Sequence, residues 1–254
     1  EEFVATLLAG LDAYPAYYAH MAPINAAGPD PVDLSPPRPA DPAELRRRIE
    51  AGEWVVDLRT RTAFAAGHVP GTLNFALSDS FVTYLGWLIP WGTPVTLLGE
   101  TAEDVAAAQR DMARIGIDRP AAAATGKPEE WAGGRPLEHI RTATFDDLAT
   151  RLGRAGRELA VLDVRRNDER RVSFVDGSLH VPIHELPGRL DEVPADRPVW
   201  VHCAAGYRAA IAASLLQRAG RDVVTIDDSY DAAADAGLPV VVTHEDGGNT
   251  STTG

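Results

Sequence analysis

The segment Pro198–Gly220 reads PVWVHCAAGYRAAIAASLLQRAG and predicts three structural elements in direct succession. The apolar run at 198–202 is typical of a buried β-strand. The small residues at 203–206 predict a tight loop, and the run at 209–219 predicts an α-helix that ends at Gly220. A strand that leads through a short loop into a helix is the unit from which helix-covered parallel sheets are built.

The same pattern occurs a second time earlier in the chain, at an offset of 104 residues for the strand of this unit (198 minus 94). Three pairs of segments align between the copies: PVTLL at 94–98 with PVWVH at 198–202, WVVDLR at 54–59 with AVLDVR at 160–165, and GHVPG at 67–71 with SFVDG at 173–177. The alternation of strands and helices predicts an α/β fold. We expect two tandem three-layer domains, each a mainly parallel sheet with helices on both faces.

The domain boundaries follow from this repeat and from a run of prolines between residues 29 and 42, which predicts a stiff linker. Asp41 and Thr144 are the predicted N-caps of the first helix in each copy. The apolar spacing of residues 1–11 predicts a further helix. The predicted divisions are an N-terminal helix and linker at 1–34, a first domain at 35–133, a second domain at 134–246 and a flexible tail at 247–254.

Composition limits the classes of function. The chain has 254 residues, 45% of them hydrophobic, and a net charge of −13. Such a charge disfavours nucleic acid and anionic lipid as partners, and no stretch has the length of a membrane span. We find no basic and apolar pattern of a signal peptide, and we expect the chain to be cytoplasmic.

The single cysteine, Cys203, lies at the end of the predicted strand. In a protein without a second thiol, it is either a small buried apolar group or a reactive group in a reducing compartment. The small residues Ala204, Ala205 and Gly206 allow the backbone to curve around the sulfur, and the helix N-terminus adds partial positive charge. Arg208 adds a permanent charge and a forked donor for an anion. The loop therefore favours the thiolate.

These residues resemble those of the rhodanese (sulfurtransferase) homology domain. The resemblance rests on DVR at 163–165, GHVPG at 67–71 and HCAAGYR at 202–208, and it covers both copies, roughly residues 41 to 240. It implies that Cys203 carries a sulfane sulfur as a persulfide and passes it to a thiophilic acceptor. It also implies that Arg208 binds an anion and that Ala204, Ala205, Gly206 and Tyr207 supply the loop amides. The implied partners are small anionic or thiol sulfur donors and acceptors, without a cofactor in this chain.

The first copy lacks this chemistry. Gly99 occupies the position of the cysteine, and Asp104 occupies that of Arg208. The segment 100–104 adds carboxylates that would repel an anionic substrate, and Thr101 to Asp104 predicts an ordinary helix cap. We expect the first copy to be a structural or docking partner of the second.

A short stretch near the start, between Tyr14 and Asn25, resembles the last part of the metallo-β-lactamase-like domain that precedes tandem rhodanese domains in some hydrolases. The His-x-His-x-Asp-His motif of that domain is not present. On this resemblance, zinc or iron is expected only in such a preceding domain. The chain is then expected to contact that domain or to form a homodimer. The alternative is an N-terminal helix packed on the first copy.

Several residues near the loop have two interpretations. Asp163 and Arg165 are predicted at the rim of the site as substrate-binding residues, with Asp163 as a partner of Arg165 or Arg208. The charged run at 165–171 is either a solvated helical face with internal ion pairs or a local positive field for an anion. His202 precedes Cys203 on a strand, so its side chain is expected to point away and to be buried.

Three functions compete on these residues: a sulfurtransferase, a cysteine-dependent phosphatase or arsenate reductase, and a non-catalytic interaction module. Phosphatases of the Cys-x5-Arg type need a wider ring for a tetrahedral oxyanion, whereas four residues separate Cys203 from Arg208. The shorter loop suits a sulfur atom. A non-catalytic module would more naturally have lost its cysteine, as the first copy has.

Overall fold

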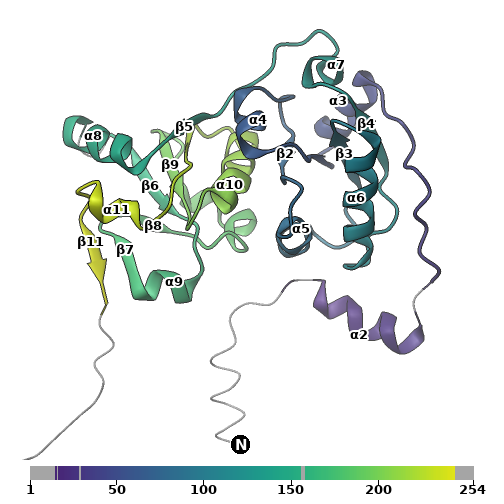
Figure 1. Ribbon diagram of the computed structural model, residues 1–254, viewed down its shortest axis with the longest axis horizontal. Helices are drawn as coiled ribbons and strands as arrows, with labels where there is room; N and C mark the ends of the chain where they lie inside the picture. Colours follow the sequence, from purple (N-terminus) through teal and green to yellow (C-terminus); the bar gives the residue numbers. More distant parts are fainter. Residues whose placement is uncertain (1–14, 16, 29, 156–157, 244–254) are drawn as a thin grey trace, which may run out of the picture.

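The computed structural model describes residues 15, 17–28, 30–155 and 158–243. The predicted helix over 1–11 and the predicted tail at 247–254 lie outside these residues. The chain forms two α/β lobes side by side, with the first copy on the right of Figure 1 and the second on the left. The expected α/β fold with two tandem domains is confirmed.

The first domain is built on a four-stranded parallel sheet in the order β2-β1-β3-β4. Helices cover both faces of this sheet (Figure 1). Its elements are α3 (Pro42–Glu50), β1 (Trp54–Asp57), α4 (Arg61–Ala66), β2 (Leu73–Asn74), α5 (Phe81–Leu88), β3 (Val95–Gly99), α6 (Ala102–Ala113), β4 (Ala122–Thr125) and α7 (Pro128–Ala132).

The second domain has a five-stranded parallel sheet in the order β5-β10-β9-β6-β8, and a short antiparallel pair, β11-β7, lies beside it. Two 3-10 turns, Leu186–Gly188 and Leu190–Glu192, lead into β9. Its elements are β5 (Arg141–Ala143), α8 (Phe145–Ala155), β6 (Ala160–Asp163), α9 (Asn167–Val172), β7 (Ser173–Val175), β8 (Leu179–His180), β9 (Val199–His202), α10 (Tyr207–Arg218), β10 (Val223–Ile226), α11 (Ala232–Asp235) and β11 (Val240–Val242).

Strand register confirms the internal repeat. In the first domain Asp57 of β1 lies opposite Leu98 of β3, and in the second domain Asp163 of β6 lies opposite His202 of β9. The two pairs occupy equivalent positions at the carboxyl ends of the central strands. The carboxyl edge of a parallel sheet is where α/β proteins bind ligands, so the sheet places the Cys203 loop at such an edge.

The predicted helix caps are present. Asp41 accepts a hydrogen bond from the Glu44 N–H, and Pro42 is the first residue of α3. Thr144 and Asp147 form the reciprocal bonds of a capping box at the start of α8. The proline-rich linker before α3 runs along the outside of the first lobe in Figure 1.

A continuous hydrophobic cluster crosses the boundary between the domains, since it includes Leu73 and Phe75 of the first and Ile211 and Leu215 of the second. Helix α10 lies at this boundary, facing α4 and β2 (Figure 1). The side-chain hydroxyl of Ser214 on α10 accepts a hydrogen bond from the Asn74 N–H at 3.1 Å. The two domains therefore pack around the helix that follows the cysteine loop.

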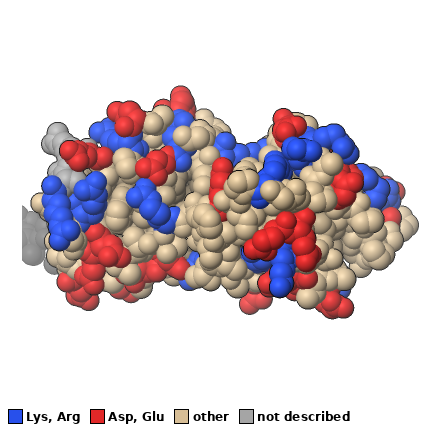
Figure 2. All heavy atoms as spheres, turned by 90° about the horizontal axis from the view of Figure 1, so that it is seen from above, with Lys and Arg blue, Asp and Glu red and all other residues tan. Residues whose placement is uncertain are grey.

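Helix α2 (Tyr18–Ala27) packs against the first domain, as the His20 ring stacks on Trp91 at 4.3 Å and Met21 lies beside Gly116. The resemblance of this region to a metallo-β-lactamase-like domain stays a prediction. No helix within the described residues is long and apolar enough to cross a membrane. Acidic and basic side chains alternate over the face shown in Figure 2.

Candidate active site

Cys203 directly follows β9 and lies four residues before α10. Strands β6 and β10 flank β9 on either side, so the loop leaves the centre of the sheet. The residue is only 2% exposed and packs within the hydrophobic cluster that crosses the domain boundary. Little of the Cys203 side chain is therefore open to solvent.

The backbone of the loop has the form that the small residues predict. Gly206 has a φ of 87°, a left-handed conformation that glycine adopts without strain. The Ala204 carbonyl accepts a hydrogen bond from the Tyr230 N–H at 2.9 Å, which fixes one side of the loop. Among the described residues, no acceptor is hydrogen-bonded to the backbone N–H groups of 204–208. These five N–H groups, on the loop and the first turn of α10, can therefore donate to a bound anion or a charged sulfur.

Arg208 does not offer a free guanidinium. Its Nη2 donates to Glu169 Oε1 at 2.7 Å, and its Nη1 donates to the other carboxylate oxygen. The Arg208 side chain is 9% exposed and that of Glu169 is 22% exposed. Burial disfavours the charge of Arg208, but the bonds to Glu169 and the charge of Cys203 raise its pKa. Both terminal nitrogens of Arg208 are thus paired with Glu169, and anion binding by Arg208 stays a prediction.

Asp163 and Arg165 form a buried ion pair, and their expected part in substrate binding stays a prediction. Asp163 pairs with Arg165 as predicted, at 2.7 Å, but both side chains are buried and the Arg165 guanidinium stacks on the Tyr230 ring at 3.6 Å. The first domain has the same pair, with Arg59 Nη2 at 2.6 Å from Asp57 Oδ2, although it has no cysteine. Because the domain without a cysteine contains the same pair, the pair supports the fold of each domain.

The reason for this burial is a shared architectural contact. Arg165 donates to the Ser173 carbonyl at 2.7 Å, and Arg59 donates to the Gly67 carbonyl at 2.9 Å. Each arginine thus joins the end of a central strand to the segment that follows the next helix. An arginine used in this way has few donors left for a ligand.

The charged run on α9 is divided between two roles. Arg170 lies within 3.3 Å of the buried Asp163 and donates to Ser178 Oγ at 2.7 Å, so it belongs to the interior network. Arg166 pairs with Asp168 at 2.8 Å on the surface, which is an internal ion pair of the predicted kind. The Arg166 N–H also donates to Glu169 Oε2 at 3.0 Å.

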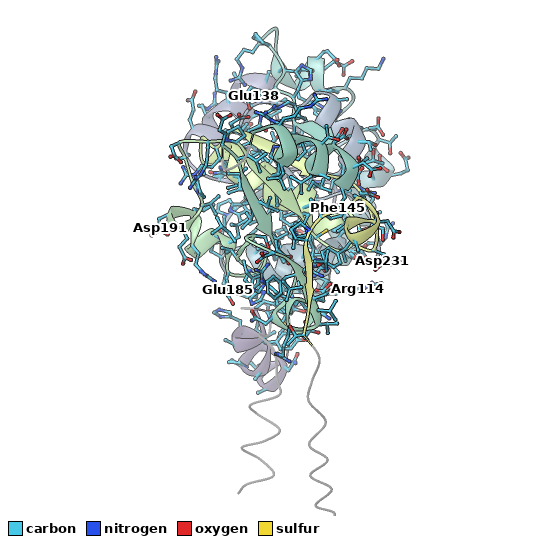
Figure 3. All side chains as sticks on the ribbon, turned by 90° about the vertical axis from the view of Figure 1, so that its left-hand side faces the viewer. Arg114, Glu138, Phe145, Glu185, Asp191 and Asp231 are labelled. Atoms are coloured by element: carbon cyan, nitrogen blue, oxygen red, sulfur yellow. The ribbon has the colours of Figure 1, made fainter. Side chains whose placement is uncertain are left out.

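His202 is buried, as predicted. Its ring stacks on Tyr230 and lies edge-on to Phe145, which Figure 3 labels in the interior of the second domain. Burial lowers the pKa of His202 to about 4. The imidazole is therefore neutral near pH 7 and supports the strand.

The first domain contributes side chains that the sequence did not single out. The Tyr207 hydroxyl donates to the Ala76 carbonyl at 2.8 Å, and the Tyr207 ring lies 5.7 Å from that of Tyr84. Burial raises the pKa of Tyr84, and the charges of Arg208 and Cys203 also act on it. Tyr84 therefore lies at the cysteine site although it belongs to the other domain.

A second contact across the domain boundary lies beside Gly206 of the cysteine loop. Arg61 Nε donates to Asp227 Oδ1 at 2.7 Å, and a β-carbon on Gly206 would lie 2.2 Å from the same oxygen. No sequence signal predicts these contacts, because the partners are far apart in the chain and belong to different copies.

The equivalent loop of the first domain is a helix start only. Thr101 and Asp104 form the reciprocal bonds of a capping box, which confirms the predicted cap. Gly99 stands at the end of β3 where Cys203 ends β9. Within the described part of the chain, no group of three or more His, Cys, Asp or Glu side chains converges as a metal site.

The chain matches the family model described as "Rhodanese-like domain" twice, over residues 41–132 and 144–236. It is 31% identical over 85 residues to a sulfurtransferase of Allochromatium vinosum, covering 33% of this chain and 79% of the relative. It is 35% identical over 85 residues to an HTH-type transcriptional regulator of Mycobacterium tuberculosis, covering 33% of this chain but only 38% of the regulator's length.

Two solved structures are also similar to parts of this chain. A rhodanese-related protein of Thermoplasma volcanium is 28% identical and is covered completely, with 41% of this chain aligned and a TM-score of 0.37. A thiosulfate sulfurtransferase of Pseudomonas aeruginosa is 22% identical and aligns with 82% of this chain and 44% of its own, with a TM-score of 0.37. The two family matches together span more than half of the sequence, and they place the cysteine loop in the second of them. The chain belongs to the rhodanese-like domain family and contains two copies of that domain.

Proposed function

We propose that the protein is a sulfurtransferase that carries a sulfane sulfur on Cys203. The observation that carries this proposal is the position of the chain's one thiol. Cys203 follows a central parallel strand and begins the loop that leads into a 12-residue helix, and the backbone N–H groups of that loop have no acceptor among the described residues. The partial charge of the helix and the amide donors favour an anionic sulfur at this point.

The reaction has two steps. The Cys203 thiolate attacks the outer sulfur of a donor such as thiosulfate, the sulfur–sulfur bond of the donor breaks, and sulfite leaves with its electron pair. A persulfide anion remains on Cys203, where the free N–H groups of the loop can donate to it. A thiophilic acceptor, cyanide or a thiolate, then attacks the terminal sulfur and releases the Cys203 thiolate.

Two features favour this reaction over phosphate-ester hydrolysis. Four residues separate Cys203 from Arg208, so the loop is short for a tetrahedral oxyanion. In addition, Glu169 already occupies the Arg208 fork that a phosphate would need. A persulfide sulfur requires less space than a phosphate group and does not need a free guanidinium.

The role we propose for the first domain is to support the cysteine loop. Tyr84 and the Ala76 carbonyl contact Tyr207, while Arg61 holds Asp227 next to Gly206. We further propose that the reaction takes place in the cytoplasm, because a lone reactive thiol needs a reducing compartment.

The test is thiocyanate formation from thiosulfate and cyanide by the whole chain and by Cys203→Ser, with circular dichroism to verify folding. We expect turnover by the unmodified protein only. Turnover by the folded serine variant at the same rate would overturn the proposal. Cys203-dependent hydrolysis of p-nitrophenyl phosphate without thiocyanate formation would point to the phosphatase instead.

A further inference from the structure

The cation that first meets an anionic sulfur donor remains to be assigned, because Arg208 is already paired inside the protein. Two of its N–H groups bond to Glu169, and a third donor, the Arg166 N–H, holds the same carboxylate. An arriving anion would have to displace a carboxylate that the fold fixes from two sides. Displacing the half-buried Glu169 carboxylate would leave it without its arginine partner, which is unfavourable.

The side chain of Arg166 is in a different situation. It is 49% exposed, and its partner Asp168 is 41% exposed. An ion pair with both members in water is weak, so a dissolved anion can replace the carboxylate at little cost. Arg166 is thus a cation that the fold presents to solvent with an exchangeable partner.

Arg166 also lies close to the ion pair of Arg208 and Glu169 at the end of the cysteine loop. Its Nε is 3.7 Å from Glu169 Oε2, the oxygen that Arg208 binds, and Arg208 closes the Cys203 loop. The exposed Arg166 guanidinium is therefore connected through Glu169 to the arginine at the end of the cysteine loop.

We propose that Arg166 receives the anionic end of the sulfur donor and that Arg208 only holds the loop. The assignment rests on the sulfurtransferase function proposed above. It implies donors that have anionic oxygens on the group that leaves, as thiosulfate and thiosulfonates do. The forked donors of Arg166 can then bond to two oxygens of that group while the outer sulfur points to Cys203.

Binding and turnover test this assignment separately. Calorimetry of thiosulfate with the Cys203→Ser chain measures the anion site without reaction, and we expect Arg166→Ala in that background to weaken binding about tenfold. In the active chain, Arg166→Ala should raise the KM for thiosulfate by a similar factor and leave kcat within about twofold. Arg166→Lys should recover only part of the affinity for thiosulfate, because an ammonium group lacks the two parallel donors of a guanidinium.

Two variants provide controls on the same helix. Arg171→Ala removes an exposed arginine of α9 and should leave both constants unchanged, whereas Asp168→Asn removes the competitor of Arg166 and should lower the KM. If thiosulfate does not bind to the Cys203→Ser chain, or if Arg171→Ala weakens binding as much as Arg166→Ala, the assignment is overturned. Binding that depends on Arg166 in a chain without sulfur transfer would instead overturn the proposed function and keep the anion site.

Discussion

Replacing Glu169 by glutamine tests the internal role of Arg208. The change keeps the size of the side chain but leaves the Arg208 guanidinium, 9% exposed, without its counter-charge. Removal of one partner from a fully buried pair costs about 3–5 kcal/mol. Because Glu169 is 22% exposed and glutamine keeps one acceptor, we expect a loss of about 2–3 kcal/mol in the free energy of unfolding.

The loss is measured by urea denaturation at pH 7.5, followed by circular dichroism. A change of that size corresponds to a fall in Tm of roughly 4–12 °C for a chain of about 250 residues that unfolds as one unit. Burial opposes the ionised form of Glu169, yet the bonds from Arg208 hold its pKa below the ordinary value. The stabilisation is therefore present above the ordinary carboxyl range and is lost as the pH falls through the lowered pKa.

The matched control is the surface pair of Arg141 and Asp222, in which both side chains are 61% exposed. Arg141→Ala should cost less than about 1 kcal/mol. A double-mutant cycle with Arg208→Met and Glu169→Leu should show that the double variant loses less than the sum of the single losses. A Glu169→Gln chain as stable as the unmodified protein would refute the reasoning, because Arg208 would then not depend on that carboxylate.

Three further changes address the loop and its support. Gly99→Cys combined with Cys203→Ser should not restore thiocyanate formation, because a side chain at Gly99 meets Asp104 and Thr101 at 3.2 Å and no arginine follows; turnover would contradict this. Gly206→Ala should destabilise the chain by about 1–3 kcal/mol and reduce kcat, since its φ is 87° and its β-carbon would lie 2.2 Å from Asp227 Oδ1. His202→Phe should flatten the fall in stability between about pH 6.5 and pH 4, on the order of 3 kcal/mol, because the folded protein keeps this histidine neutral at a pKa of about 4 while the unfolded chain takes up the proton.

Controls and readouts follow from the same structure. Gly177 has a similar φ of 73° with open space around it, so Gly177→Ala separates backbone strain from the collision at Gly206. Equal losses in the two variants would argue against the collision. For His202, urea denaturation at several pH values is compared with that of the unmodified chain, and an unchanged slope in the phenylalanine variant would contradict the assignment.

The internal repeat made much of the fold predictable. Strand ends, helix caps and the loop around Cys203 depend on residues close together in the chain, such as Asp41 with Glu44 and Thr101 with Asp104. Local hydrogen bonds of this kind leave a sequence signature. The residues around Cys203 predicted the reactive loop, and the comparison of the two copies showed that only the second copy has a thiol there.

The partners of the site were not predictable in the same way. A carboxylate in a run of charges resembles a solvated ion pair, and nothing in the sequence indicates that Glu169 reaches Arg208, 39 residues further along. Likewise, Asp163 and Arg165 have the composition of a polar rim, but the fold buries them beneath Tyr230. Burial depends on what packs above a residue, and local patterns do not contain that information.

The contributions of the first domain were the least predictable. Tyr84 and Arg61 lie in a copy without catalytic residues, and they reach the cysteine loop only because the two lobes pack around α10. The segment that connects the two domains also contacts the first domain, because the Glu138 carbonyl accepts a hydrogen bond from the His68 N–H. Figure 3, in which the second domain faces the viewer, shows Glu138 at the upper end of the molecule.

The intact mass of the chain after incubation with thiosulfate tests the central claim most directly. The chain has one cysteine, so a persulfide has one place to form. We predict an increase equal to one sulfur atom, about 32 Da, that cyanide removes and that Cys203→Ser lacks. An unmodified chain that gains no mass, or a serine variant that gains the same mass, would contradict the assignment of Cys203 as the sulfur carrier.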